Sequence, residues 1–329
     1  MFQITLKNNK TFNCDKDSTI FEAAKSNGVA LEHSCLTARC RSCVVKVIGG
    51  ETKNRLDDLV LSIDEKEQNY VLSCNAIPTK DLTLDVEDLG DIILYEKKIV
   101  PSKIQSIEYL TKNVIKLSLR LPPTANFKFN SGQYVNLIWS GINRSYSVAN
   151  YYKEKSNLIF FIKKYEGGLM SDYWFNKAKE NDLLRVEGPL GSFFLRETNK
   201  KNIIFLATGT GVAPVKSIIE DLENSDKDFS NKKVYIFVGA RYEEDLFWSP
   251  NLLKTLEIIY IPVLSRSKDD WVGKKGYVQN AVIDQNIDLT NSQVYACGSN
   301  EMIESAKIIL TANALPENQF FSDAFICTN

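Results

Sequence analysis

The sequence predicts a multidomain α+β protein in three parts: a small β-rich unit, an antiparallel β-barrel and a parallel α/β sheet. Its 329 residues are enough for two or three domains. Short segments of alternating polarity recur between residues 99 and 197 at the spacing of barrel strands. After residue 200, continuous apolar segments alternate with helical ones, which is typical of a parallel sheet.

Residues 1–90 form the predicted β-rich unit, and a cysteine-containing loop interrupts its strands. The strand-like segments are Phe2–Leu6, Val44–Ile48, Tyr70–Ser73 and Leu82–Val86. One short helix is predicted over Ile20–Ser26, because Asp17-Ser18-Thr19 supplies good N-capping residues. Gly49-Gly50 marks a turn, and the change from acidic to basic residues across Glu87–Lys98 marks a linker.

Four cysteines are the candidate metal ligands: Cys35, Cys40, Cys43 and Cys74. Their order, C-x4-C-x2-C and a distant fourth, is the spacing that holds a [2Fe-2S] cluster in plant-type ferredoxins. A four-cysteine zinc site and a thioredoxin-like C-x2-C pair are the alternatives. Zinc ribbons usually show two C-x2-C pairs, and a thioredoxin-like motif would leave Cys35 and Cys74 unexplained. The spacing therefore favours the cluster, which is a one-electron carrier.

The cysteine loop has neither helical nor alternating periodicity, so its backbone N–H groups can point at the sulfurs and tune the cluster's potential. It departs from the plant-type signature C-x-x-G-x-C-[GS]-x-C at two positions. Ala38 stands where a glycine is usual, and a positive φ would strain it. Arg41 replaces a small residue, and its charge is expected to raise the potential of the anionic cluster or to meet a partner.

The second and third parts differ in the pattern of their strands. The predicted barrel strands are Lys103–Ile107, Val114–Leu119, Tyr134–Trp139, Ser145–Ala149, Leu158–Lys163 and Leu183–Glu187. A structural turn over Gly188–Phe193 is predicted to close the barrel. The predicted parallel strands are Asn202–Ala207, Val234–Val238, Ile258–Val263 and Val294–Ala296.

Arg144-Ser145-Tyr146-Ser147 on a barrel strand is a candidate site for a flat ring with a diphosphate. Alternation puts Arg144 and Tyr146 on one face of the strand. Arg144 can pair with a diphosphate and Tyr146 can pack against a ring, while Ser147 offers a hydroxyl near the ring's reactive edge. Taken alone the motif is weak, because an exposed arginine beside a strand tyrosine is common.

Two glycine-containing segments are candidate phosphate sites. Gly167-Gly168-Leu169-Met170-Ser171 begins a helix, whose free N–H groups bind phosphate oxygens, although a plain turn explains it equally well. Thr208-Gly209-Thr210-Gly211-Val212-Ala213-Pro214 lies between an apolar strand and a helix, where glycines let a pyrophosphate approach the backbone. It lacks the third glycine of the usual dinucleotide fingerprint.

Three more segments complete the set. Cys297-Gly298-Ser299 follows an apolar strand at the carboxyl edge where ligands of α/β sheets bind, although a cysteine there is commonly core filler. Ser265-Arg266 follows the third parallel strand, and a guanidinium suits a phosphate. Aromatic residues in Phe320–Phe325 close the chain as a possible terminal strand. His33, the one histidine, is interpreted as a packing residue.

The order of these segments carries more information than any one of them. Five motifs follow one another along the chain: R-x-Y-S, G-G-x-x-S, G-P-L-G, G-T-G-x-A-P and C-G-S. That order resembles the ferredoxin–NADP reductase superfamily over residues 99–329, and residues 1–90 resemble a plant-type ferredoxin of β-grasp fold. The resemblance implies a [2Fe-2S] ferredoxin domain (1–90), an FAD-binding barrel (99–197) and an NAD(P)-binding domain (200–329). Electrons would pass from NADH or NADPH through FAD and the cluster to a partner protein.

The resemblance also implies the cofactor-binding residues. For FAD these are Arg144, Ser145, Tyr146, Ser147, Gly167, Gly168 and Ser171, with Phe325 near the flavin. For the pyridine nucleotide they are Gly209, Thr210, Gly211, Pro214, Ser265, Arg266, Cys297 and Gly298. Ser147 beside the flavin and Cys297 near the nicotinamide are the predicted catalytic residues. The choice between NADH and NADPH stays open, because Ser265-Arg266 in a polar loop is commonly just solvated.

Two stretches narrow the resemblance. Leu117–Ala125 and Phe320–Phe325 resemble those of CDP-6-deoxy-Δ3,4-glucoseen reductases, which feed electrons to a sugar-nucleotide dehydrase in 3,6-dideoxyhexose synthesis. The reductase component of a multicomponent oxygenase carries the same modules and is one alternative. A non-enzymatic ferredoxin-type electron carrier is the other. The expected partner is thus an iron–sulfur dehydrase or an oxygenase component.

Bulk properties narrow the classes of partner. The net charge is -1, with 40 basic and 41 acidic residues, so neither nucleic acid nor an anionic membrane is an expected partner. No apolar run approaches a membrane span, and Met1–Leu6 enters a strand with no room for a signal peptide. Seven cysteines, four of them in the predicted cluster site, argue against a disulfide framework. A cytoplasmic location is therefore expected.

Overall fold

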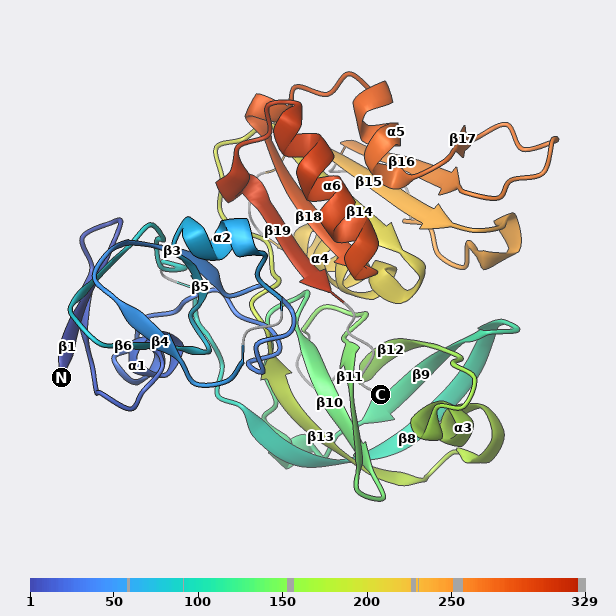
Figure 1. Ribbon diagram of the computed structural model, residues 1–329. Coiled ribbons are helices and arrows are strands. Elements are labelled where there is room, and N and C mark those ends of the chain that lie inside the picture. Colours follow the sequence, from blue (N-terminus) through green and yellow to red (C-terminus); the bar gives the residue numbers. More distant parts are fainter. Residues whose placement is uncertain are drawn as a thin grey trace. The chain divides into compact units, whose positions relative to one another are not determined.

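The computed structural model describes residues 1–57, 60–90, 92–152, 157–225, 229, 231–250 and 257–324 (Figure 1). The chain divides into two compact units, Met1–Leu94 and Tyr95–Asn329. The first is a small β-grasp unit, and the second contains an antiparallel barrel followed by a parallel α/β sheet. The predicted fold class is confirmed.

The first unit is a mixed sheet packed against one helix. Its strand order is β2 (Thr11–Cys14), β1 (Phe2–Leu6), β7 (Leu82–Leu84), β3 (Val44–Gly49) and β5 (Tyr70–Leu72). Strands β1 and β7 are parallel, and the other neighbours are antiparallel. Helix α1 (Ile20–Ser26) begins at Thr19, which forms a capping box with Glu22. Ile4, Leu6 and Ile20 belong to one buried cluster between helix and sheet.

Short elements complete this unit. They are the two-stranded sheet of β4 (Thr52–Asn54) and β6 (Ala76–Pro78), and helix α2 (Ile63–Glu67). Ser62 caps α2 in a second capping box, with Glu65 as its acidic member. The sequence did not predict β2, β4, β6 or α2, because segments of three to five residues show no clear period.

The barrel of the second unit is an antiparallel six-stranded sheet that curls until its outer strands meet. In spatial order its strands are β11 (Ile142–Ser147), β10 (Tyr134–Trp139), β13 (Leu183–Leu190), β8 (Lys98–Thr111), β9 (Val114–Arg120) and β12 (Leu158–Lys163). Val148 bridges to Phe160 and the Ala149 N–H donates to the Ile159 carbonyl at 2.7 Å, which joins the outer edges. Helix α3 (Leu169–Asp172) continues as a π turn, Tyr173–Lys177.

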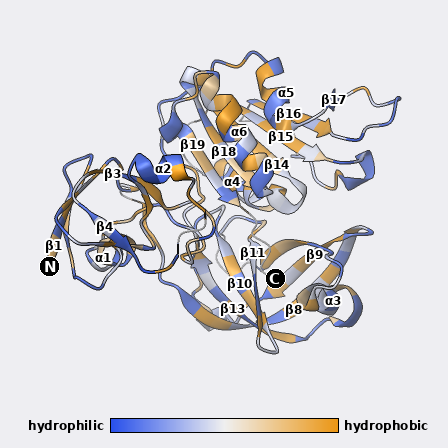
Figure 2. Ribbon diagram, in the orientation of Figure 1, coloured by the Kyte–Doolittle hydropathy of each residue, from blue (hydrophilic) through white to orange (hydrophobic). Residues whose placement is uncertain are grey.

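The parallel sheet carries helices on both faces. Its strand order is β17 (Lys274–Lys275), β16 (Glu257–Leu264), β15 (Lys233–Ala240), β14 (Asn202–Thr208), β18 (Ser292–Gly298) and β19 (Phe320–Ala324). Its helices are α4 (Val212–Asn224), α5 (Val278–Asp284) and α6 (Asn300–Ala312). Phe205 faces the core beneath α4 and Leu206 the core beneath α5 and α6. Figure 2 shows hydrophobic residues concentrated along these strands.

The remaining elements are short 3-10 turns at Pro123–Ala125, Gly209–Gly211, Glu243–Asp245, Leu289–Asn291 and Glu317–Gln319. One buried cluster includes Phe161 and Phe193 from the barrel part together with Phe205 and Tyr295 from the sheet. The barrel and the sheet therefore share a continuous core. In the part of the chain that the structure describes, no helix has the length and apolar character needed to cross a membrane.

Candidate functional site

The four cysteines predicted as metal ligands, Cys35, Cys40, Cys43 and Cys74, come together around one loop, in two pairs. The Cys43 and Cys74 sulfurs lie 3.3 Å apart, and the Cys35 N–H donates to the Cys40 sulfur at 3.3 Å. Two sulfur pairs fit a cluster in which each iron takes two protein ligands.

Backbone N–H groups surround these sulfurs, as the irregular loop leads one to expect. The N–H groups of Thr37 and Arg39 both donate to the Cys35 sulfur at 3.4 Å. The hydrogen bond from the Cys40 thiol, with those from Thr37 and Arg39, lowers the pKa of Cys35, and the same pairing raises the pKa of Cys40. The N–H groups of Thr37 and Arg39 stabilise a thiolate at Cys35, and the thiolate is the form that binds metal.

The loop reaches this geometry through left-handed residues that are not glycine. Leu36, Ala38 and Arg41 have φ values of +55°, +58° and +62°. Ala38 therefore adopts the conformation that was expected to strain it, at a cost of about 1–2 kcal/mol. Its side chain is buried in a small cluster with Cys43, Leu61 and Leu72, which contributes to offsetting that cost.

Arg41 meets a partner within its own domain. Its guanidinium forms a two-armed ion pair with Glu65 of α2, in which Nη1 lies 3.2 Å from Oε2 and Nη2 contacts Oε1. Nη1 also donates to the Val60 carbonyl. Arg41, followed by the Ser62 N–H, lowers the pKa of Glu65. The positive charge beside the cluster loop is thus compensated by a negative one.

Removing that compensation is expected to raise the cluster's reduction potential. Glu65→Gln leaves Arg41 as an uncompensated cation near the cluster, and positive charge favours the reduced, more negative form. A redox titration of the holoprotein measures the effect, and Glu67→Gln on the same helix is the control because Glu67 is exposed. A Glu65→Gln potential equal to that of Glu67→Gln would contradict the expectation.

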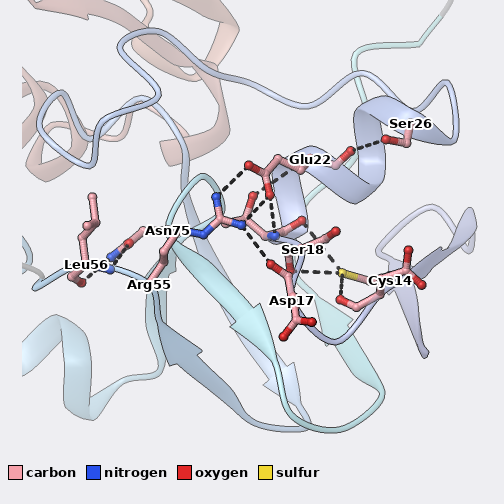
Figure 3. A network of polar contacts seen from close by, with 10 residues as sticks. Cys14, Asp17, Ser18, Glu22, Ser26, Arg55, Leu56 and Asn75 are labelled. Atoms are coloured by element: carbon pink, nitrogen blue, oxygen red, sulfur yellow. Dashed lines mark hydrogen bonds and ion pairs between the residues drawn. The ribbon is translucent and has the colours of Figure 1, made fainter.

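A polar network holds Asn75, the residue that follows the fourth cysteine (Figure 3). Asn75, which follows Cys74, accepts from the Leu56 N–H at 2.8 Å and donates to the Leu56 carbonyl at 2.9 Å. Arg55 donates to both carboxylate oxygens of Glu22, each at 2.7 Å. The network ties the segment before α2 to α1 and to the residue beside Cys74.

The Arg55–Glu22 pair predicts how the domain responds to acid. Arg55 lowers the pKa of Glu22 to about 2, below its ordinary value of about 4.3. The pair therefore stabilises the fold at pH values above about 4.3, and this stabilisation is lost as the pH falls toward 2. Because the Glu22 side chain is 49% exposed, the contribution is about 1 kcal/mol at most.

We expect Arg55→Met to lose its cluster absorbance at a higher pH than the wild-type protein during slow acidification. Lys80→Met is the matched control, since the Lys80–Glu51 pair is exposed at 62% and 63% and belongs to the same domain. Coincident curves for the two variants would show that the Arg55–Glu22 pair does not hold the domain together.

Strand β11 presents the R-S-Y-S residues on alternate faces. Arg144 and Tyr146 are both partly buried, and the Arg144 guanidinium donates to the Asn143 carbonyl at 2.8 Å. Trp174 donates its indole N–H to the Tyr146 hydroxyl at 2.9 Å and meets the ring edge to face. Burial raises the pKa of Tyr146 to about 12, so the phenol stays neutral. Trp174 thus orients Tyr146, a role that sequence reasoning missed.

The two serines of this motif lie in different surroundings. Ser147 is buried, at 6% exposure, at the end of β11. Ser145 is exposed and donates to Asn136 at 2.8 Å, in a chain that continues to Glu187 and Lys97. The Ser145 side chain therefore lies on the strand face opposite to Arg144 and Tyr146, and takes part in a surface network.

The G-G-x-x-S segment lies beside β11, because α3 packs against that strand. Gly167 has a φ of +73°, and Gly168 is the N-cap of α3. The buried Ser171 hydroxyl accepts from the Tyr165 N–H at 2.8 Å, which fixes the entry into the helix. Arg144, Tyr146, Gly168 and Ser171 are thus on neighbouring elements of the barrel.

The nucleotide motifs converge at the carboxyl edge of the parallel sheet. Strands β14 and β18 are neighbours, with Ala207 opposite Cys297. A Cβ on Gly211 would lie 2.2 Å from the Cys297 carbonyl oxygen, and one on Gly298 would lie 2.1 Å from the Thr208 hydroxyl. Both glycines are therefore required for close approach, and G-T-G and C-G-S form one surface. Pro214 is buried in the first turn of α4, where its missing N–H costs no helical hydrogen bond.

Cys297 itself is fully buried. Burial, with the nearby Asp323 carboxyl, raises the pKa of its thiol well above the ordinary value. Its sulfur is packed in the core under α4, while its main chain meets Gly211. The structure thus gives Cys297 a backbone role at the edge of the sheet, and a catalytic role for its thiol stays a prediction.

Ser265 and Arg266 lie at the same edge, two strands from the glycine loop. The Ser265 N–H donates to the Ala240 carbonyl at 3.0 Å and the Arg266 N–H to the Arg241 carbonyl at 2.9 Å. Both side chains are exposed, and so is that of Arg241. Arg241 was not singled out in the sequence, although it directly follows a parallel strand, as Ser265 does. The main chain here joins two loops that each carry an arginine.

Strand β19 confirms the terminal strand and ends at Ala324, opposite Gly298, whereas Phe325 lies outside the described residues. The ring of His33 packs on Phe21, and its Nδ1 lies 2.9 Å from the Leu31 carbonyl oxygen. His33 is thus held in a packing arrangement next to the cysteine loop.

Three family models match successive parts of the chain. A 2Fe-2S iron-sulfur cluster binding domain matches residues 4–79, an oxidoreductase FAD-binding domain residues 101–195, and an oxidoreductase NAD-binding domain residues 205–307. The matches follow one another in the order that the sequence motifs predicted. The donor sets described above, four paired sulfurs and two glycine-rich helix starts, fit these cofactors.

Similar proteins cover nearly the whole chain. The CDP-6-deoxy-L-threo-D-glycero-4-hexulose-3-dehydrase reductase of Yersinia pestis is 38% identical over 96% of this chain and 95% of its own. Protein RfbI of Salmonella typhimurium is 36% identical over 98% of this chain and 95% of its own. The reductase component of propane 2-monooxygenase from Mycolicibacterium smegmatis is 29% identical over 94% of this chain and 92% of its own. The cytochrome P450 reductase GcoB of Amycolatopsis has the same fold, with a TM-score of 0.71 over 99% of both chains at 22% identity.

Proposed function

The chain belongs to the family of iron–sulfur flavoprotein reductases, and we propose that it delivers electrons from NAD(P)H to a dehydrase acting on a CDP-linked 6-deoxyhexulose. The protein is an oxidoreductase with one domain for each of three cofactors. When bound, the nucleotide supplies a hydride, the flavin splits the electron pair, and the cluster passes electrons singly. The sulfur quartet and the nucleotide edge in one chain support the electron path, and overall similarity supports the choice of acceptor.

For the flavin, we assign binding to the face of β11 and the start of α3. Arg144 would pair with the diphosphate, and the N–H groups at Gly168 would add to that contact. Tyr146, held neutral and oriented by Trp174, would pack against the ring system. Ser147 would offer its hydroxyl at the end of the strand. The outward direction of Ser145 limits its proposed contribution to the main chain.

For the pyridine nucleotide, we assign an extended path across the carboxyl ends of β16, β15, β14 and β18. Three strand spacings make about 14 Å, the scale of an extended dinucleotide. The ribose phosphate end would lie at Ser265-Arg266, the pyrophosphate at Gly209-Thr210-Gly211 and the nicotinamide near Cys297-Gly298. The missing Cβ atoms of Gly211 and Gly298 support this path, because they let the glycine loop and the C-G-S segment pack directly against each other at this edge.

For the electron acceptor, overall similarity favours the dehydrase over an oxygenase. Identity to the dehydrase reductase is 38% over 96% of the chain, against 29% over 94% for the propane monooxygenase component. The propane monooxygenase component also aligns over 94% of this chain, so the oxygenase alternative remains the second candidate. A carrier with only a working cluster domain is disfavoured, because FAD-binding and NAD-binding family models match the rest of the chain.

The test is reconstitution of the holoprotein with each class of acceptor under anaerobic conditions. We expect continued consumption of NADH or NADPH, beyond a single reduction of the bound cofactors, and deoxygenation of the sugar only when the CDP-6-deoxyhexulose dehydrase and its substrate are both present. Omission of the sugar nucleotide is the control, since the dehydrase then has no substrate to which it can pass electrons. Faster delivery to an oxygenase component than to the dehydrase would overturn the assignment and favour the alternative.

A further inference from the structure

Three side chains of helix α4 form hydrogen bonds with the main chain of the segment that follows β11. The Lys216 ammonium donates to the Ala149 carbonyl at 3.0 Å, and the Ser217 hydroxyl donates to the Asn150 carbonyl at 2.8 Å. The Glu220 carboxylate accepts from the Tyr151 N–H at 3.3 Å and pairs with Lys216. Three consecutive residues are thus held by one face of one helix. We call this set of contacts the α4 clasp.

The clasped segment has little freedom on its other side. The Asn150 side chain donates to the Asn157 carbonyl at 2.9 Å and accepts from the Ile159 N–H at 2.8 Å. These bonds tie it to the start of β12, so the segment cannot shift without breaking contacts on both sides. Ser217 is fully buried and Asn150 is 7% exposed, so solvent cannot easily replace the bond between them.

The clasp joins the two elements that carry the cofactor residues. Ser147 ends the strand just before the clasped segment, and α4 begins directly after Gly211. Ser217 is six residues, or about 9 Å, along the helix from Gly211. Because a helix moves as a rigid rod, a shift at Ser217 is passed on to the glycine loop. The clasp therefore determines the position of the glycine loop relative to β11.

We propose that Lys216, Ser217 and Glu220 are positioning residues that fix the nicotinamide against the flavin for hydride transfer without touching either cofactor. This rests on the flavin and nucleotide sites assigned above. A displacement of 1 Å in a reacting pair can cost about 100-fold in rate. The clasp holds a buried contact between the two sites, at the place where such a displacement would arise.

Ser217→Ala in the holoprotein is the sharpest test. Anaerobic mixing with saturating NADH follows flavin bleaching, the step before any protein acceptor is involved. We expect the bleaching rate to fall by about 10- to 100-fold, with a larger isotope effect from deuterated NADH. The KM for NADH and the FAD and cluster contents should stay at wild-type values, since the glycine loop itself is intact. Lys216→Met provides a second variant, because its loss leaves the buried hydroxyl in place.

Ser305→Ala is the matched control. Ser305 lies on α6 in the same sheet domain and accepts from the Gln279 amide at 2.9 Å, but does not reach the barrel. An unchanged bleaching rate in both Ser217→Ala and Lys216→Met would overturn the proposal, even if their unfolding midpoints fell. A wild-type protein that bleaches with neither NADH nor NADPH would instead show that the assigned cofactor sites are wrong. The identity of the final acceptor does not affect this readout.

Discussion

Replacing Cys74 with serine is expected to separate the two halves of the activity. The flavin should still be reduced by NADH, because β11, α3 and the nucleotide edge all belong to the other compact unit. Delivery to a one-electron protein acceptor should fall to background, because the fourth sulfur of the cluster is gone. The absorbance of the cluster should be lost while that of FAD remains. We expect this to be the largest single effect on electron delivery.

The structural reason lies in how Cys74 is held. Its sulfur pairs with that of Cys43, and the neighbouring Ser73 N–H donates to the Cys43 carbonyl at 2.9 Å. Asn75 fixes the other side through Leu56. Serine fits this position but offers a harder oxygen that seldom replaces thiolate at iron–sulfur centres. The loss should therefore be one of ligation, without unfolding of the domain.

Cys14→Ser is the matched control for this experiment. Cys14 is fully buried in the same domain, but its thiol donates to the Asp15 and Ser18 carbonyls, each at 3.5 Å. A serine hydroxyl can donate to the same groups, so cluster content and electron delivery should be retained. Measurement is by iron content and by acceptor reduction at fixed NADH. If Cys74→Ser kept its cluster and its delivery rate, the assignment of the fourth ligand would be wrong.

The sequence predicted the fold best where local signals agree with tertiary packing. Tyr134–Trp139 and Leu158–Lys163 match β10 and β12 residue for residue, because buried residues alternate along the first part of β10 and β12 is a continuous apolar run that ends at Lys163. Ile20–Ser26 matches α1 because Thr19 and Glu22 form the capping box that the local sequence suggests. By contrast, Lys274–Lys275 pairs only through its neighbour β16, and no local pattern could reveal it.

The candidate site was less predictable, because its geometry depends on which faces meet. Strand alternation already implied that Ser145 faces away from Arg144, and the structure bears this out. The sequence left two roles open for the Cys297 thiol, core filler and working group, and its burial depends on α4 covering that strand. The α4 clasp could not be predicted from the sequence either. The spacing of Lys216, Ser217 and Glu220 places them on one helix face, but only the folded chain shows what that face meets.

Gly211→Ala is expected to have the second large effect, on nucleotide binding. An added Cβ would lie 2.2 Å from the Cys297 carbonyl oxygen and 2.7 Å from its carbonyl carbon, so main chain must move. Forcing extra volume into packed structure costs about 1–3 kcal/mol of stability. The displaced loop would lose N–H contacts to the pyrophosphate, so the KM for NAD(P)H should rise by about 10-fold or more at 1.4 kcal/mol per decade. Steady-state kinetics and urea unfolding measure the two effects.

Gly209→Ala separates crowding from backbone strain. Gly209 has a φ of +55°, but no atom lies within 4 Å of an added Cβ, so this variant has only the left-handed cost of about 1–2 kcal/mol. Both glycine variants should therefore lose stability, whereas Gly211→Ala should suffer the greater loss of nucleotide binding. Equal KM values in the two variants would mean that contact with Cys297 does not shape the site. A larger rise for Gly211→Ala, with FAD and cluster contents unchanged, would place the pyrophosphate where the glycine loop meets the Cys297 main chain.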